Sequence, residues 1–194
     1  MLIKRDFEVA APVDKVWQFF DDIPQVAGCL PGTELTKDLG DDKYEGRVTV
    51  RMGPVKLQFG GTAEITERDE AGKRVVIHAS GAELRGQGQA SMVVTAVLAR
   101  AARGTKVDVT QDLQLAGAAA QYGRGMISDV TAVLMRDFSA NMAARIDAAE
   151  RGDTPAAAAA ASPAGGLTLG MRAAMMALQR VFRRFFLPYQ ASPS

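Results

Sequence analysis

Residues 44–65 read YEGRVTVRMGPVKLQFGGTAEI, and this stretch decides the fold. Apolar or small residues at 44, 46, 48, 50 and 52 alternate with charged or polar residues at 45, 47, 49 and 51. Gly53-Pro54 then marks a turn, after which the alternation resumes from Val55 to Ile65. A period of two is typical of a strand with one buried face. The stretch therefore predicts two strands of an antiparallel sheet.

The same pattern continues outward in both directions. Residues 2–10 alternate like a strand, and from Thr33 to Leu115 the chain predicts six strands separated by turn residues. Between these regions, residues 13–20 have the spacing of an amphipathic helix, and a second short helix is expected from about residue 23 to residue 28. The order so far is one strand, two helices and six strands.

A long helix is expected from about Ala119 to Glu150. Its apolar stripe is expected to face the sheet, and it consists of Tyr122, Met126, Ile127, Val130, Val133, Leu134, Phe138, Met142 and Ile146. This order of elements predicts an α+β domain at residues 1–150, in which a curved antiparallel sheet of about seven strands holds the long helix against its concave face.

The charges divide the chain into a body and a tail. Residues 1–153 contain 19 Lys/Arg and 22 Asp/Glu, whereas residues 154–194 contain four Arg and no acidic residue. Residues 151–166 are rich in Ala, Pro and Gly and are expected to be a linker. The segregation of charge indicates that body and tail meet different partners.

The tail is expected to form a basic amphipathic helix over residues 167–187, followed by a disordered end at 188–194. An apolar face, a basic opposite face and the absence of acids are typical of a helix that lies in a membrane interface. The expected membrane-binding residues are Met171, Arg172, Met175, Leu178, Arg180, Phe182, Arg183, Arg184, Phe185 and Phe186. Packing of this helix on the body or on a partner protein is the alternative.

The sequence offers little material for catalysis. His78 is the sole histidine and is expected to point outward, and Cys29, the sole cysteine, is expected to be a packed thiol. No grouping of residues has the spacing of a metal site, and the interspersed charges of the body disfavour nucleic acid. We therefore expect a protein that is not an enzyme and has no covalent or metal cofactor. The start of the chain shows no apolar signal segment, so a cytoplasmic location is expected.

Several motifs resemble those of a known family. In their order they resemble the carbon monoxide dehydrogenase G-subunit (CoxG-like) proteins of the START-like, or SRPBCC, helix-grip superfamily. The resemblance covers about residues 1–150 and rests on Phe7–Pro12 with Val16-Trp17, Cys29–Glu34, Tyr44–Gly46, Gly53–Lys56, Phe59–Gly61, Ile127–Val130 and Asp137–Asn141. It implies a cavity-forming domain associated with molybdenum-containing carbon monoxide dehydrogenases or related molybdenum hydroxylases, as a maturation or membrane-recruitment factor.

A set of mostly apolar residues is expected to line a cavity between sheet and helix. Gln111 falls on the inward parity of its strand, where its amide can hydrogen-bond a ligand carbonyl; a bulge that turns it outward is the alternative. Residues of the short helices are expected to form a lid. The expected lining is Ile23, Val26, Leu30, Val48, Val50, Met52, Leu57, Phe59, Met92, Val94, Val109, Gln111, Tyr122, Met126, Ile127, Val130 and Leu134. From the residues alone a filled core is the alternative, and the resemblance favours the cavity.

Cavity and tail together suggest a protein that docks on the inner face of the cell membrane, binds anionic lipids there and holds a lipophilic ligand. A respiratory quinone is the preferred ligand, because carbon monoxide oxidation must pass electrons to a membrane acceptor. A ligand-free recruitment or maturation scaffold for the dehydrogenase is the alternative, and an enzyme acting on apolar substrates is a third hypothesis.

Overall fold

A computed structural model describes residues 1–52 and 55–152, and these residues belong to one compact unit. The turn residues 53–54, the expected linker beyond residue 152, the expected amphipathic helix at 167–187 and the end at 188–194 lie outside the described residues. The boundaries expected for these segments stay predictions.

The order of elements follows the expectation, with a short 3-10 turn added before the long helix. The elements are β1 (Leu2–Val9), α1 (Val13–Asp21), α2 (Ile23–Cys29), β2 (Thr33–Gly40), β3 (Lys43–Met52), β4 (Val55–Asp69), β5 (Arg74–Glu83), β6 (Gln89–Ala101), β7 (Gly104–Ala116), η1 (Gly117–Gln121) and α3 (Arg124–Glu150).

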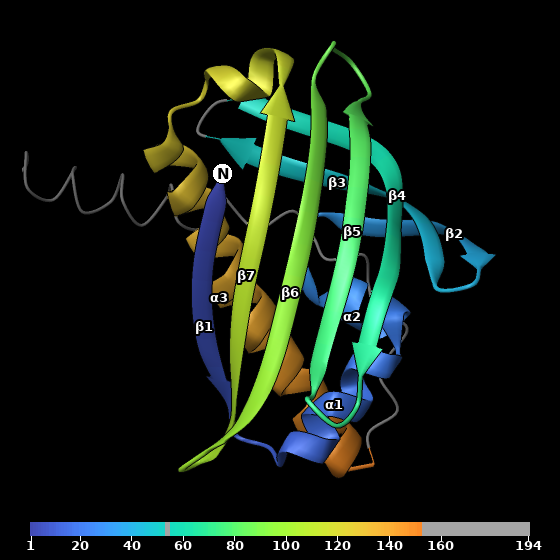
Figure 1. The fold of residues 1–194 in the computed structure, drawn as a ribbon, viewed down its shortest axis with the longest axis vertical. Helices are drawn as coiled ribbons and strands as arrows, with labels where there is room; N and C mark the ends of the chain where they lie inside the picture. The colour runs from blue at the N-terminus through green and yellow to red at the C-terminus, as the bar shows by residue number, and fades with distance from the viewer. Residues whose placement is uncertain (53–54, 153–194) are drawn as a thin grey trace, which may run out of the picture. The chain divides into compact units, whose positions relative to one another are not determined.

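The seven strands form one antiparallel sheet in the order β1-β7-β6-β5-β4-β3-β2 (Figure 1). Strands β2 to β7 follow one another as a meander, and β1 pairs with β7 at the edge. The register matches the alternation in the sequence, since Val48 lies opposite Phe59 and Val50 opposite Leu57. The predicted seven-stranded antiparallel sheet is confirmed.

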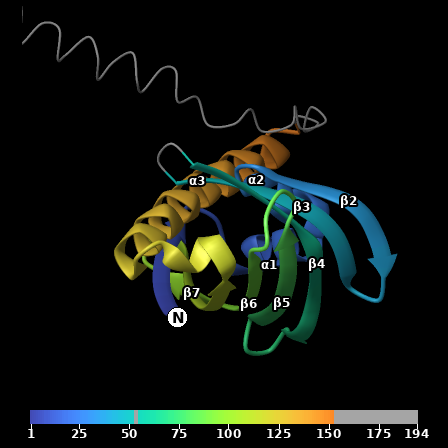
Figure 2. The same ribbon diagram turned by 90° about the horizontal axis from the view of Figure 1, so that it is seen from above.

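The sheet curves around α3, which lies against its concave face (Figure 1, Figure 2). Irregular pairing between Ile65 and Glu67 of β4, and at two places in β2, accompanies this curvature, because bulges bend strands. Together, sheet and helix give the helix-grip fold that the sequence predicts. Among the described residues, no helix has the length and apolar character that crossing a membrane requires.

The long helix begins later than predicted. It starts at Arg124 rather than Ala119, after Tyr122 adopts an extended backbone conformation with ψ of 126°. Residues 117–121 form η1 instead, which begins at Gly117 with a φ of 74°. Glycines at 123 and 125 disfavour helix at this point. The break moves the start of the helix and places η1 over the end of the sheet.

The apolar interior divides into two clusters along α3. The first lies at the end of the sheet near α1 and α2, where Trp17, Phe20, Val107, Phe138 and Met142 are buried together. The second is smaller and lies near η1, where Leu57, Phe59 and Ala119 are buried. We call these the closed-end cluster and the mouth cluster.

Two side-chain contacts hold α2 to the C-terminal half of α3. The Asn141 amide nitrogen donates to the Cys29 carbonyl at 2.9 Å, and the Arg145 guanidinium donates to the Gly28 carbonyl at 3.1 Å. Asp22 caps the start of α2 by accepting from the Gln25 backbone N–H at 3.0 Å. The closed-end cluster is therefore fixed by polar contacts as well as by packing.

Gly32 is expected to be required for stability. Its φ is +77°, a Cβ there would lie 2.4 Å from the Thr49 carbonyl oxygen, and its own carbonyl accepts from the Thr49 N–H at 2.8 Å. We expect Gly32→Ala to lower the free energy of unfolding by about 2–4 kcal/mol. The substitution adds backbone strain and disrupts the hydrogen bond between the Thr49 N–H and the Gly32 carbonyl. Urea denaturation measures the change.

Gly40→Ala is the matched control. Gly40 has a φ of +79° but nothing within 4 Å of a Cβ, so this variant bears the backbone cost alone, about 1–2 kcal/mol. Equal losses in the two variants would show that close approach to Thr49 does not matter.

Cys29 is expected to be unreactive in the folded protein. It is buried, and burial raises the pKa of its thiol to about 11, against a smaller lowering by the Arg145 charge. The thiolate fraction at pH 7 is then roughly one in ten thousand. We expect slow reaction with Ellman's reagent at pH 7–8 until the protein is unfolded in urea. Rapid labelling of the native protein would contradict this assignment.

Candidate ligand-binding site

The inner face of the sheet carries the strand residues of the expected cavity. Leu57, Phe59 and Val109 are buried, and Val48, Val50, Met92 and Val94 face inward but are only half-buried. Met52 lies in β3, and its side chain is outside the described part of the structure. Half-buried apolar side chains on the inner face indicate that the helices leave this part of the sheet incompletely covered.

On α3, the expected residues occupy different faces. Ile127 is buried, Val130, Leu134 and Tyr122 are half-buried, and Met126 is 45% exposed. Val133, which the sequence placed on the core stripe, is 48% exposed. The residues that α3 buries are Ile127, Thr131, Phe138, Met142 and Ile146. Met126 and Val133 lie beside this row, so their expected inward orientation is not observed.

The expected lid residues lie at the closed end. Val26 is buried in the closed-end cluster, Leu30 packs against it, and Ile23 is half-buried at the start of α2. In Figure 1, α1 and α2 lie at the end of the sheet opposite the yellow η1 segment. These residues therefore close the end of the barrel-like sheet that lies opposite the mouth cluster.

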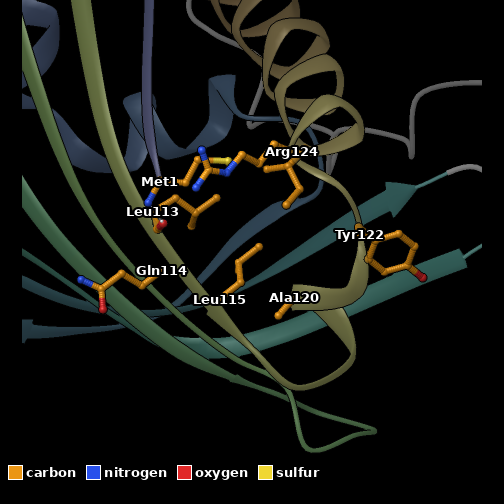
Figure 3. A pocket seen from close by; sticks show the side chains of 8 residues that line it. Met1, Leu113, Gln114, Leu115, Ala120, Tyr122 and Arg124 are labelled. Carbon is orange, nitrogen blue, oxygen red and sulfur yellow. Dashed lines mark hydrogen bonds between the residues drawn. The ribbon is translucent and has the colours of Figure 1, made fainter.

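A pocket of about 300 Å³ opens beside the mouth cluster, between the end of β7, η1 and the start of α3 (Figure 3). We call this opening the mouth. Arg124 extends from α3 toward Met1, and Leu113 and Leu115 project from β7. The lining is Met1, Leu113, Gln114, Leu115, Ala120, Tyr122, Arg124 and Ile127. Its volume is at the lower end of the range for small-molecule sites, which is about 300–1,000 Å³.

Tyr122 and Ile127 are the members of the expected set that line this pocket. Leu113 and Leu115 have the inward parity of β7, so the strand pattern already contained them. Ala120 and Arg124 were missed because the sequence predicted a continuous helix through residues 119–124. The break before α3 is what brings these two residues to the pocket.

Gln111 faces inward, as expected. Its side-chain nitrogen donates to the thioether sulfur of Met135 on α3 at 3.3 Å, so the amide lies between sheet and helix. A thioether is a weak acceptor. The amide is thus available to a stronger acceptor.

Arg5 also faces inward, and it is not among the site residues predicted from the sequence. Its guanidinium donates to Ser128 Oγ at 2.7 Å and to the Ser128 carbonyl at 3.3 Å, while its Nε is buried with no hydrogen-bond partner. The strand parity of residues 3–9 was the available signal, since Arg5 shares its face with Ile3, Phe7 and Val9.

Glu83 is a second inward charged residue that sequence reasoning missed. It lies at the end of β5 opposite Phe59, and its Oε2 is buried with no hydrogen-bond partner. A Cβ on Gly86 or Gly88 would lie 2.3 or 2.8 Å from this oxygen, so the glycines make room for the carboxylate. His78 is exposed on the same strand, as the sequence predicted.

Solved structures share this fold at low sequence identity. A conserved protein from Geobacillus kaustophilus is 21% identical, with a TM-score of 0.66 over 76% of this chain and 95% of that one. Protein Ms6760 from Mycobacterium smegmatis is 19% identical, with a TM-score of 0.54 over 76% and 92%. TTHA0849 from Thermus thermophilus is 16% identical, with a TM-score of 0.54 over 75% and 99%. These similarities show the fold alone.

No curated protein matches the chain. A family match extends over residues 6–147, which includes α1, α2, strands β2 to β7 and nearly all of α3. The matched region therefore contains both apolar clusters and almost the whole inner face of the sheet. On this match, the chain belongs to the carbon monoxide dehydrogenase G-subunit (CoxG) family.

Proposed function

We propose that this protein is a membrane-docked carrier that holds a lipophilic ligand for a carbon monoxide dehydrogenase. Family membership implies association with that enzyme. The carrier itself performs no catalysis and needs no covalent or metal cofactor. It works at the inner face of the cell membrane, where it exchanges the ligand with the bilayer.

One observation carries the proposal: apolar side chains on the concave face stay half-buried beside an apolar pocket that opens at the mouth. Met92 and Val94 of the sheet, and Val130 on α3, are only partly covered. Leu113, Leu115 and Ile127 line the pocket of about 300 Å³. Apolar surface left partly in water stabilises a lipophilic ligand that covers it, by about 25 cal/mol per Å².

A respiratory quinone is the ligand that best combines these features. Its isoprenoid tail suits the apolar lining, and its carbonyl oxygens accept hydrogen bonds from groups such as the inward amide of Gln111. Electrons from carbon monoxide oxidation need an acceptor that is soluble in the membrane, and a quinone is such an acceptor.

Membrane docking rests on the sequence of residues 167–187. Four arginines without acidic residues favour an anionic leaflet by about 1 kcal/mol each, and Phe182, Phe185 and Phe186 add apolar contact with the interface. Arginines at 180, 183 and 184 disfavour insertion across the bilayer. We therefore expect residues 167–187 to lie on the surface of a membrane that contains anionic lipid, without crossing it.

The purified protein is expected to carry a quinone or another isoprenoid lipid. Organic extraction of the full chain, isolated from cells under mild conditions, followed by mass spectrometry identifies it. Ala120→Phe is expected to lower the recovered lipid severalfold, because Ala120 is exposed and lines the pocket, so a phenyl ring occupies that space.

The matched control is Ala99→Phe, which adds the same ring at an exposed position near the end of β6. It should leave the recovered lipid unchanged. Absence of any isoprenoid lipid from the unmodified protein would refute the carrier and favour the alternative, a ligand-free recruitment or maturation scaffold.

The full chain is expected to co-sediment with vesicles that contain phosphatidylglycerol and not with pure phosphatidylcholine vesicles. Replacing Arg180, Arg183 and Arg184 with glutamine should weaken partitioning roughly 100-fold, since three charges of about 1 kcal/mol each are lost. Raising the salt concentration should weaken it as well.

The control replaces Arg85, Arg100 and Arg103, three exposed arginines of the body, with glutamine. It removes the same net charge from a different surface. If both triple variants lose partitioning equally, binding depends on net charge and the assignment to residues 167–187 fails.

A further inference from the structure

We infer that Arg5, Gln111 and Ser128 form a head-group site beside the pocket, between β1, β7 and α3, which binds a hydrogen-bond acceptor carried by a lipophilic ligand. The inference rests on the proposed carrier function and names the chemistry that the carrier recognises. The ligand has a carbonyl or carboxylate head, which enters first, and an apolar tail, which points toward the mouth.

The three residues come together across two strands and one helix. In the β1–β7 pairing Ile3 lies opposite Gln111 and Arg5 opposite Val109, so Arg5 and Gln111 are diagonal neighbours on one face, with Cβ atoms roughly 7–8 Å apart or less. Arg5 contacts Ser128 and Gln111 contacts Met135. Positions 128 and 135 are two turns apart on α3, so one stretch of helix covers both strand residues.

Each residue has a donor to spare. Arg5 Nε is buried without a partner. The Gln111 amide donates only to a thioether among the described residues. Ser128 Oγ accepts from Arg5 at 2.7 Å, which leaves its own O–H to donate. These donors therefore select a ligand group that accepts hydrogen bonds.

The charge of Arg5 is not neutralised within the described residues. Its guanidinium donates to Ser128 and, at 3.3 Å, to the Lys4 carbonyl, and neither acceptor is a carboxylate. Taking a guanidinium out of water without an anionic partner costs stability. An arginine retained there for a ligand explains this cost, because an acceptor placed between Arg5 and Gln111 satisfies both groups.

The pocket lies next to this site. Leu113 is two residues from Gln111 on the same face of β7, and Ile127 precedes Ser128 on α3. From there the lining continues through Leu115 and Ala120 toward the opening (Figure 3). An amphiphile in a bilayer presents its head at the interface, so a docked carrier receives the head first.

The test compares three probes with the full chain: decylubiquinone, decylbenzene and oleate. Decylbenzene has the same alkyl tail as decylubiquinone but no acceptor oxygen, and oleate has a carboxylate head. Binding is measured by equilibrium dialysis and by the shift of the unfolding temperature on adding each probe. The wild-type protein should bind decylubiquinone or oleate more tightly than decylbenzene.

Arg5→Met and Gln111→Leu should each weaken that preferred binding roughly tenfold or more, because a hydrogen bond to a charged or buried partner is lost. Lys4→Met, which removes an exposed cation from the outer face of the same strand, should change nothing. Without any probe, Arg5→Met should unfold at or above the wild-type temperature, since it removes a partly buried charge that has no carboxylate partner among the described residues. A lower temperature with unchanged binding would assign Arg5 a structural role and overturn the inference.

The outcomes separate the two proposals. Loss of preference for decylubiquinone in Arg5→Met supports the site with a quinone head, and loss for oleate alone supports it with a carboxylate head and contradicts the quinone. Equal binding of decylubiquinone by wild type and both variants refutes the head-group site but keeps the carrier. Failure of the wild type to bind any probe refutes both.

Discussion

An α-helix with its side chains is about 10–12 Å across, whereas seven strands spaced about 4.8 Å apart form a sheet roughly 30 Å wide. A single helix cannot cover the inner face of such a sheet. In this chain α3 packs mainly along the edge strand β1, and α1 and α2 cover one end of the sheet. The remaining inner surface around Met92, Val94 and Val130 stays half-buried. A helix-grip domain can therefore keep a cavity, because a single helix is too narrow to cover the whole inner face of the sheet.

Much of the fold was predictable from alternation, because in a strand with one buried face every second residue is apolar and marks that face. Val48, Val50, Leu57 and Phe59 lie where their parity placed them, and so does Gln111. The start of α3 was not predictable in the same way. The helix was predicted to begin at about Ala119, ahead of the first residue of its apolar stripe at Tyr122, but residues 117–121 form η1 and the helix begins after Gly123.

The site was harder to predict than the fold because it depends on where surface is left uncovered. Periodicity put Met126 inward, yet the helix buries the row that contains Ile127 and Thr131. Parity put Arg5 on the same face as Ile3, Phe7 and Val9, and only the contact with Ser128 shows that its guanidinium lies against α3. Buried polar atoms without partners are found in coordinates and not in a residue pattern. The tail presents the opposite case, since its residues lie outside the described structure and its interpretation rests on sequence alone.

The division of the apolar interior into two clusters gives the domain two ends with different resistance to local opening. The closed-end cluster is large and is tied to α3 through Asn141 and Arg145, whereas the mouth cluster buries three residues in the part of the molecule described. Free energies of local unfolding follow the amount of buried apolar contact. Local unfolding is therefore expected to concentrate around η1, next to the pocket, while the closed end keeps its structure.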